Sequence, residues 1–249
     1  MSGPEQTMER AVLIIPAYNE AATLGDVLAR VAESAPGCEV VVVDDGSRDG
    51  TGEIAAHAGA TVLRHPFNLG YGAALQTGYK YARECDAALV VQMDADGQHD
   101  PAQIRGLAAG IRSGDYDLVV GSRFIETSGY RMGLLRSVGR KAFSALARLA
   151  GLRVSDPTSG FQGMNRRVPD FYARDFFPTD YPDVDVLLTA FRQGLRVGEH
   201  PVRMTEGSRE STLHGGLRSV YYVYKMLLST FTATARTARD VANQENDQP

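Results

Sequence analysis

Residues 87–100 read AALVVQMDADGQHD, an apolar run that leads directly into two aspartates one residue apart. The run predicts a buried strand. Carboxylates at the end of a buried strand are costly unless they are paired or bound to a metal ion. The Asp94-Ala95-Asp96 motif therefore indicates that this strand ends at a functional edge of a sheet.

The same pattern, a short apolar run followed by a helical segment, recurs through the first 124 residues. Continuous apolar runs without polar alternation are typical of strands that are covered on both faces. The alternation predicts an α/β fold of the Rossmann type, with a mostly parallel central sheet flanked by helices. Strands are expected over residues 11–18, 39–46, 60–65, 87–95 and 117–124, and helices over 20–34, 49–57, 71–84 and 101–113.

The rest of the chain is less regular. We interpret residues 10–239 as one domain, with a nucleotide-binding half (10–120) and an acceptor half (121–239), between disordered tails at 1–9 and 240–249. In the second half we expect a basic helix over 133–150, an irregular stretch over 154–168, a helix over 184–193, a strand over 196–204 and an amphipathic helix from about residue 217.

Composition limits the function classes. Hydrophobic residues make up 43% of the 249 residues, charged residues 22%, and the formal net charge is −4, so overall charge argues against nucleic-acid binding. An anionic ligand must then meet a local basic cluster. Cys38 and Cys85 lack metal-ligand spacing and are expected to be reduced and structural. Neither a signal peptide nor a membrane-spanning run is predicted, so a cytoplasmic location is expected.

Polar residues follow four of the predicted strands, in the segments 16–20, 44–47, 68–72 and 94–96. In an open α/β sheet, ligands bind beyond the carboxyl ends of the strands. Ser47 or Asp49 could equally serve as a helix N-cap. The coincidence of four such segments at one sheet edge favours a binding site there.

An Asp-x-Asp motif after a strand suits Mg²⁺ or Mn²⁺, which binds through one or two carboxylates and takes its other ligands from water and substrate phosphates. Haloacid-dehalogenase-type phosphatases place a related motif on the first strand, and sugar nucleotidyltransferases open with a Gly-rich loop; this chain fits neither pattern. His99 is either a ligand or base, or a residue that faces solvent or a neighbouring carboxylate.

Seven segments together resemble family 2 glycosyltransferases with a GT-A fold, in the dolichyl-phosphate mannose synthase-like branch of polyprenyl-phosphate sugar synthases. They are IIPAYNEAATL, VVVDDGSRDGT, NLGYGAALQTGY, MDADGQHDP, VVGSRF, DPTSGFQGMNR and YPDVDVLLTAFRQGLRVGEHPVRM. The resemblance implies a donor site, for a GDP- or UDP-sugar, formed by Pro16, Tyr18, Glu20, Asp45, Gly72, Asp94 and Arg209. It also implies a metal site at Asp94, Asp96 and Gln98. The chain has Tyr71 where the family often has Lys or Arg.

The acceptor half carries a cluster of basic residues. Arginine binds phosphate through its planar donors, and the resemblance places a lipid phosphate in this region. The expected acceptor-binding residues are Arg123, Arg131, Arg136, Arg140 and Ser159.

The resemblance implies inverting transfer of a sugar from a nucleotide-sugar to a polyprenyl phosphate, with Asp96, Asp185 and Arg123 as the catalytic residues. If the acceptor were a hydroxyl, Asp185 would be the candidate base, with Asp183 in reserve. A nucleotide-sugar-binding module without catalysis is a third reading. The last helix could pack on the core, lie peripherally on the inner face of the cell membrane, or dock a membrane subunit or a second protomer.

Overall fold

The computed structural model describes residues 10–125, 144–145, 147–180 and 182–204. Several expectations concern residues outside these ranges: the two tails, most of the basic helix and the final amphipathic helix. Arg131, Arg136, Arg140 and Arg209 also lie outside the described residues.

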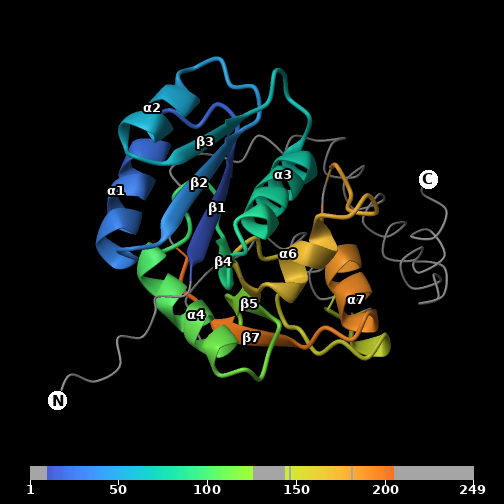
Figure 1. Ribbon diagram of the computed structural model, residues 1–249. Helices are drawn as coiled ribbons and strands as arrows, with labels where there is room; N and C mark the ends of the chain where they lie inside the picture. The colour runs from blue at the N-terminus through green and yellow to red at the C-terminus, as the bar shows by residue number, and fades with distance from the viewer. Residues whose placement is uncertain (1–9, 126–143, 146, 181, 205–249) are drawn as a thin grey trace.

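The elements alternate as the sequence predicts (Figure 1). The strands are β1 Ala11–Ala17, β2 Glu39–Asp44, β3 Thr61–Arg64, β4 Leu89–Gln92, β5 Leu118–Ser122, β6 Gln162–Asn165 and β7 Val197–Pro201. The helices are α1 Leu24–Ser34, α2 Thr51–His57, α3 Tyr71–Glu84, the 3₁₀ helix η1 Pro101–Gln103, α4 Ile104–Arg112, α6 Arg167–Tyr172 and α7 Val184–Arg192.

The seven strands form one sheet in the order β3-β2-β1-β4-β6-β5-β7. All neighbouring pairs are parallel except those of β6, which runs antiparallel to both β4 and β5. The prediction of a mostly parallel sheet is confirmed. The expectation of an irregular stretch over 154–168 is wrong in part, because it contains β6, an interior strand between β4 and β5, and the start of α6.

Helices cover both faces of the sheet, which explains the continuous apolar strands. On one face, α1 and α4 pack their buried Leu28, Val31 and Leu107 against alternate residues of β1 and β4. On the other face, α3, α6 and α7 cover the remaining alternate residues, among them Ile14 and Val90. Figure 1 shows α1, α2 and α4 on one side of the sheet and α3, α6 and α7 on the other.

The position of a ligand site follows from the strand order. From β1 the chain moves outward to β2 and β3, and then returns to form β4 on the other side of β1. The sheet therefore has a topological switch point between β1 and β4, and such points open a crevice beyond the carboxyl ends of the strands. Asp94 and Asp96 follow β4 at this crevice.

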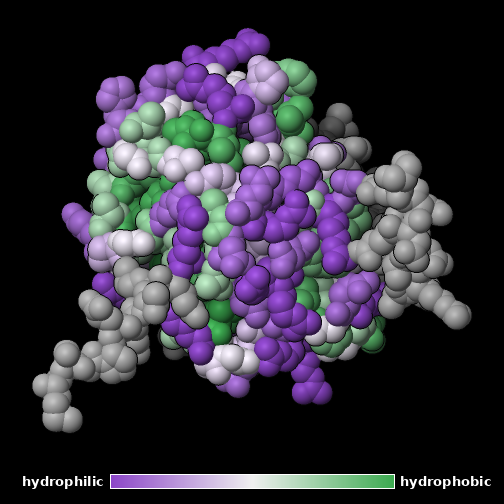
Figure 2. Space-filling view, in the orientation of Figure 1, coloured by the Kyte–Doolittle hydropathy of each residue, from purple (hydrophilic) through white to green (hydrophobic). Residues whose placement is uncertain are grey.

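Hydrophilic residues form a broad band down the middle of the face seen in Figure 2, and apolar residues gather beside it, most evidently at the upper left. Within the described ranges, none of the helices combines the length and the apolar character that crossing a bilayer requires.

Candidate active site

The loops that follow β1 and β2 are joined by hydrogen bonds. The backbone N–H of Asn19 donates to Ser47 Oγ at 3.0 Å, and Asn19 Oδ1 accepts from the N–H of Arg48 at 2.9 Å. The N–H of Glu20 donates to Thr51 Oγ1 at 2.9 Å. Asn19 adopts a left-handed backbone with φ 55°, which asparagine tolerates better than most residues. The two loops therefore form one rigid wall.

Asp49 and Ser47 have different roles in this wall. Asp49 Oδ1 accepts from the N–H of Thr51 at 3.1 Å, in the first turn of α2, and Asp49 Oδ2 accepts from the N–H of Ala21 at 3.0 Å. Ser47 accepts from the β1 loop instead. The N-cap of α2 is Gly50, so the helix-capping reading is wrong for both residues, and Asp49 instead ties the start of α2 to the β1 loop.

The residues of the first loop that were predicted to line the donor site differ in their exposure to solvent. Pro16 is buried within β1, whereas Tyr18 is 46% exposed beside it. Glu20 Oε2 lies 3.0 Å from Thr23 Oγ1, which also lies 3.1 Å from the carbonyl oxygen of Ala95. Thr23 thus links the first loop to the segment between Asp94 and Asp96.

Asp45 is held by a buried histidine. His65 Nδ1 lies 2.7 Å from Asp45 Oδ1, and the N–H groups of Leu69 and Gly70 donate to the two oxygens of Asp45 at 2.8 and 2.9 Å. His65 Nε2 lies 2.9 Å from Thr77 Oγ1 on α3. Asp45 is therefore fixed to the turn before α3. The sequence analysis missed this role of His65.

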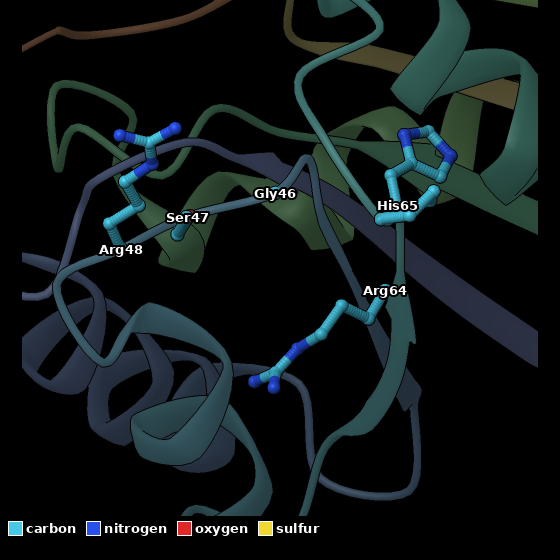
Figure 3. A pocket seen from close by; sticks show the side chains of 6 residues that line it. Gly46, Ser47, Arg48, Arg64 and His65 are labelled. Atoms are coloured by element: carbon cyan, nitrogen blue, oxygen red, sulfur yellow. The ribbon is translucent and has the colours of Figure 1, made fainter.

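A hollow of about 420 Å³ adjoins Asp45. It is lined by Gly46, Ser47, Arg48, Arg64, His65 and Pro66. In Figure 3, Arg48 and Arg64 extend from two sides of it in different directions. Arg64 donates to Asp44 and Glu53, so its guanidinium is already engaged within the protein.

Both oxygens of Asp94 are engaged. Tyr71 OH donates to Asp94 Oδ1 at 2.8 Å, and His99 Nε2 lies 3.1 Å from Asp94 Oδ2. Burial alone would raise the pKa of Asp94, but the hydrogen bond and electrostatic attraction of His99, the Tyr71 hydroxyl and the Arg123 cation hold this pKa below its usual value. Of the two readings of His99, the one in which it faces a neighbouring carboxylate is confirmed.

Asp96 makes fewer hydrogen bonds than Asp94 within the described part of the chain. Its Oδ1 accepts only the N–H of Gln98, at 2.9 Å, among the hydrogen bonds described. Burial, the Asp94 carboxylate and, more weakly, Glu20 raise the pKa of Asp96 above its usual value. A cation beside Asp96 would favour its ionised form.

The donor set fits a hard divalent cation that keeps non-protein ligands. Among the described residues, three or more His, Cys, Asp or Glu side chains do not converge on one point. A closed zinc-type site needs four protein ligands. Mg²⁺ or Mn²⁺ instead binds through one or two carboxylates, with water and phosphate oxygens completing its shell. Asp94 and Asp96 are the two carboxylates after β4 that could serve as such a pair.

Gly72 packs against protein. Its N–H donates to the carbonyl oxygen of Asp180 at 2.9 Å, and the N–H of Ala73 donates to that of Thr179 at 3.0 Å. A Cβ at position 72 would overlap the carbonyl oxygen of Pro178. Glycine is therefore required here because the 178–180 segment approaches the start of α3.

Arg123 is fixed by a buried aspartate. Its Nε and Nη2 donate to the two oxygens of Asp156 at 2.5 and 2.6 Å, and Asp156 is fully buried. The neighbouring backbone is held from β7, where Glu199 Oε1 accepts from the N–H groups of Ser155 and Asp156. The carbonyl oxygen of Asp156 also accepts from the N–H of Ser159 at 3.2 Å, in the loop that follows it. Glu199 is not among the residues that the sequence predicts for the site.

The other predicted acceptor-side residues are mostly buried. Ser159 is 3% exposed, and its Oγ accepts from the N–H of Phe161 at 3.3 Å. Asp185 is 8% exposed, and its Oδ1 accepts from the N–H groups of Asp183 and Val186 at the start of α7. Burial and the Asp94 carboxylate raise the pKa of Tyr71, and the charge of Asp183 adds a smaller contribution.

The family model described as "Glycosyl transferase family 2" matches residues 12–170 of the chain. Undecaprenyl-phosphate mannosyltransferase of Micrococcus luteus is 33% identical over 222 residues, which cover 84% of this chain and 89% of that protein. Polyprenol monophosphomannose synthase of Mycolicibacterium smegmatis is 32% identical over 209 residues, which cover 80% and 78%.

Solved structures match the fold. Glucosyl-3-phosphoglycerate synthase from Mycobacterium tuberculosis, in complex with Mn²⁺ and UDP-glucose, superposes with a TM-score of 0.69 at 21% identity, covering 91% of this chain and 79% of that one. At this identity the likeness shows the fold alone, a GT-A fold. The family model covers more than half of the chain, and the chain therefore belongs to glycosyl transferase family 2.

Proposed function

We propose that this glycosyltransferase moves a sugar from a nucleotide-sugar, GDP- or UDP-linked, to a polyprenyl phosphate with inversion at the anomeric carbon. The observation that carries the proposal is the pair of carboxylates, Asp94 and Asp96, at the switch point beside β1. The relatives from Micrococcus luteus and Mycolicibacterium smegmatis, whose names state polyprenyl acceptors, support the choice of acceptor.

The donor would lie along the carboxyl edge of the sheet. Tyr18, Glu20 and Asp45 would hold the base and ribose at the joined loops, beside the hollow of Figure 3. Asp94 and Asp96, with Gln98, would hold Mg²⁺ or Mn²⁺ against the diphosphate. When bound, the ion would neutralise the leaving diphosphate.

The acceptor would approach from the Arg123 side. Because a phosphate oxygen is already ionised near neutral pH, its attack on the anomeric carbon needs no strong base. Arg123, held rigid by Asp156, would stabilise the phosphate in the attacking position, together with Arg131, Arg136 and Arg140. A hydroxyl acceptor would instead require Asp185 or Asp183 to take up a proton.

Two measurements test the proposal. A thermal-shift panel of nucleotide-sugars with Mn²⁺ identifies the donor, and the radiolabelled donor is then incubated with a short prenyl phosphate. Label in the organic phase is the expected result. Label only in a water-soluble product would favour a hydroxyl acceptor, and tight donor binding without any transfer would favour a non-catalytic binding module.

A lipid acceptor also requires the site to reach a bilayer. Residues 217–239, outside the described part of the chain, carry apolar residues at helical spacing with basic residues between them. We propose that this segment contacts anionic lipid or a separate membrane subunit. Co-sedimentation with anionic vesicles, weakened by Lys225→Glu with Arg236→Glu, would support lipid; retained activity without sedimentation would favour the subunit.

A further inference from the structure

A chain of polar side chains leads from the core to Asp94. Gln92 is the last residue of β4, and Asp94 lies two residues beyond it in the loop that follows. Tyr71 and Tyr79, two turns apart on α3, meet these two residues. Tyr79 OH donates to Gln92 Oε1, Gln92 Nε2 donates to Tyr71 OH at 3.3 Å, and Tyr71 OH donates to Asp94 Oδ1 at 2.8 Å.

Chemistry fixes the direction of this chain. An ionised carboxylate only accepts hydrogen bonds, so Tyr71 must use its single hydroxyl hydrogen on Asp94. Tyr71 can then only accept from Gln92, which turns the amide NH₂ toward it and leaves the amide oxygen for Tyr79. Tyr79 and Gln92 are 1% and 3% exposed, so water does not compete with the hydrogen bond between these two residues.

The Asp94 carboxylate is also confined from its other side. His99 Nε2 lies 3.1 Å from Oδ2, and His99 is itself 3% exposed and packs on the Phe161 ring. Gly160 closes the space, since a Cβ there would lie 2.8 Å from Asp94 Oδ2 and 3.1 Å from Tyr71 OH. The carboxylate therefore has one orientation before a cation arrives.

We propose that Tyr71 is a positioning residue whose hydroxyl, aligned by Gln92 and Tyr79, holds Asp94 in the orientation that receives the divalent cation. The inference rests on the proposed function, because it takes Asp94 as a ligand of that ion. Groups that orient a metal ligand commonly change metal affinity 10- to 100-fold when they are removed. Tyr71 itself would touch neither the ion nor the sugar.

Tyr71→Phe removes only the hydroxyl oxygen. The matched control is Tyr81→Phe, because Tyr81 lies on the same helix and its hydroxyl also donates to a carboxylate, that of Glu39 near the start of β2. Binding of Mn²⁺ is followed by electron paramagnetic resonance of the free ion, in the presence of UDP or GDP. We expect about tenfold weaker Mn²⁺ binding in Tyr71→Phe and unchanged binding in Tyr81→Phe.

Gln92→Met tests the alignment. It should weaken Mn²⁺ binding in the wild-type background and add little in the Tyr71→Phe background, because the two residues act through one hydrogen-bond chain. Wild-type Mn²⁺ affinity in Tyr71→Phe would overturn the inference alone. If Tyr71→Phe weakened metal-free nucleotide binding as much as it weakened Mn²⁺ binding, the inference would also be overturned, because Tyr71 would then belong to the donor site. If wild-type protein bound no Mn²⁺ with either nucleotide, the metal site of the proposed function would fail as well.

Discussion

His65 Nδ1 lies 2.7 Å from Asp45 Oδ1, and this contact ties the end of β2 to the turn that starts α3. With Asp45 ionised, Nδ1 must carry the hydrogen, and Nε2 faces Thr77. The orientation of Asp45 in the proposed donor site therefore depends on His65.

His65→Ala should weaken nucleotide binding and lower stability together. The variant loses a hydrogen bond to a charged group, worth about 1.5–3 kcal/mol, and frees the Asp45 carboxylate to turn. We expect roughly tenfold weaker binding of the nucleoside diphosphate by calorimetry, which is about 1.4 kcal/mol. His57→Ala, on the exposed face of α2, is the control. Unchanged nucleotide affinity with lowered stability would restrict His65 to a folding role.

Asp96→Asn should separate stability from function. Because burial and Asp94 raise the pKa of Asp96, its ionised form is disfavoured in the folded protein, and removing that charge should leave the melting temperature of the metal-free protein unchanged or higher. Stabilisation by Mn²⁺ with nucleoside diphosphate should disappear. Thermal unfolding with and without Mn²⁺ and the nucleoside diphosphate measures both effects. Asp26→Asn, at an exposed position of α1, is the control. A full ligand-induced shift in Asp96→Asn would remove Asp96 from the metal site.

Arg123 requires a paired substitution. Arg123→Met alone leaves the fully buried Asp156 without its cation, and breaking such a pair costs about 3–5 kcal/mol. Arg123→Met with Asp156→Asn should recover most of that stability in urea unfolding. If Arg123 binds the acceptor phosphate, the KM for prenyl phosphate should stay raised in the double variant. Full activity in the double variant would show that Arg123 acts only through the fold.

The sequence predicts the elements whose signal is local. β4 is an apolar run, and the helical pattern over 71–84 coincides with the observed α3. β6 was missed because Gln162–Asn165 reads Gln-Gly-Met-Asn, which has no apolar alternation. Its place between β4 and β5 is decided by hydrogen bonds to strands more than 40 residues away in the chain.

The same distinction holds for the site. Asp94 and Asp96 could be predicted because two carboxylates after an apolar strand are unusual by themselves. The contacts Tyr71–Asp94 and His65–Asp45 span 23 and 20 residues. The first depends on how α3 lies over the sheet, and the second on the register between β2 and β3. One signal was available: Gln92 is a polar residue inside a buried strand, and such a residue needs a partner.

The last prediction concerns how the stability of the protein at low pH depends on Asp117. This residue is fully buried and immediately precedes β5. Its carboxylate accepts from Asn165 Nδ2 at 2.8 Å, from the N–H of Arg196 at 2.8 Å and from Arg167 Nη1 at 3.2 Å, so it joins the ends of β5, β6 and β7. Burial would raise the pKa of Asp117, but the hydrogen bonds and charges of Arg196, Asn165 and Arg167 lower it far below its usual value.

A carboxyl group with a lowered folded-state pKa stabilises the protein above its unfolded-state pKa of about 3.9, and this stabilisation is lost as the pH falls toward the folded-state value. Asp117→Asn should therefore lower the free energy of unfolding by about 2 kcal/mol near pH 7, which is the scale of one hydrogen bond to a charged group. The effect is not larger because the side chains of Arg167 and Arg196 are half exposed. The difference from wild type should shrink steadily below about pH 4. Urea unfolding at pH 7, 5, 4 and 3 measures it, with the exposed neighbour Asp115→Asn as control. A difference that stays constant across these pH values would mean that Asp117 stabilises the three strands by shape and neutral hydrogen bonding, without its charge.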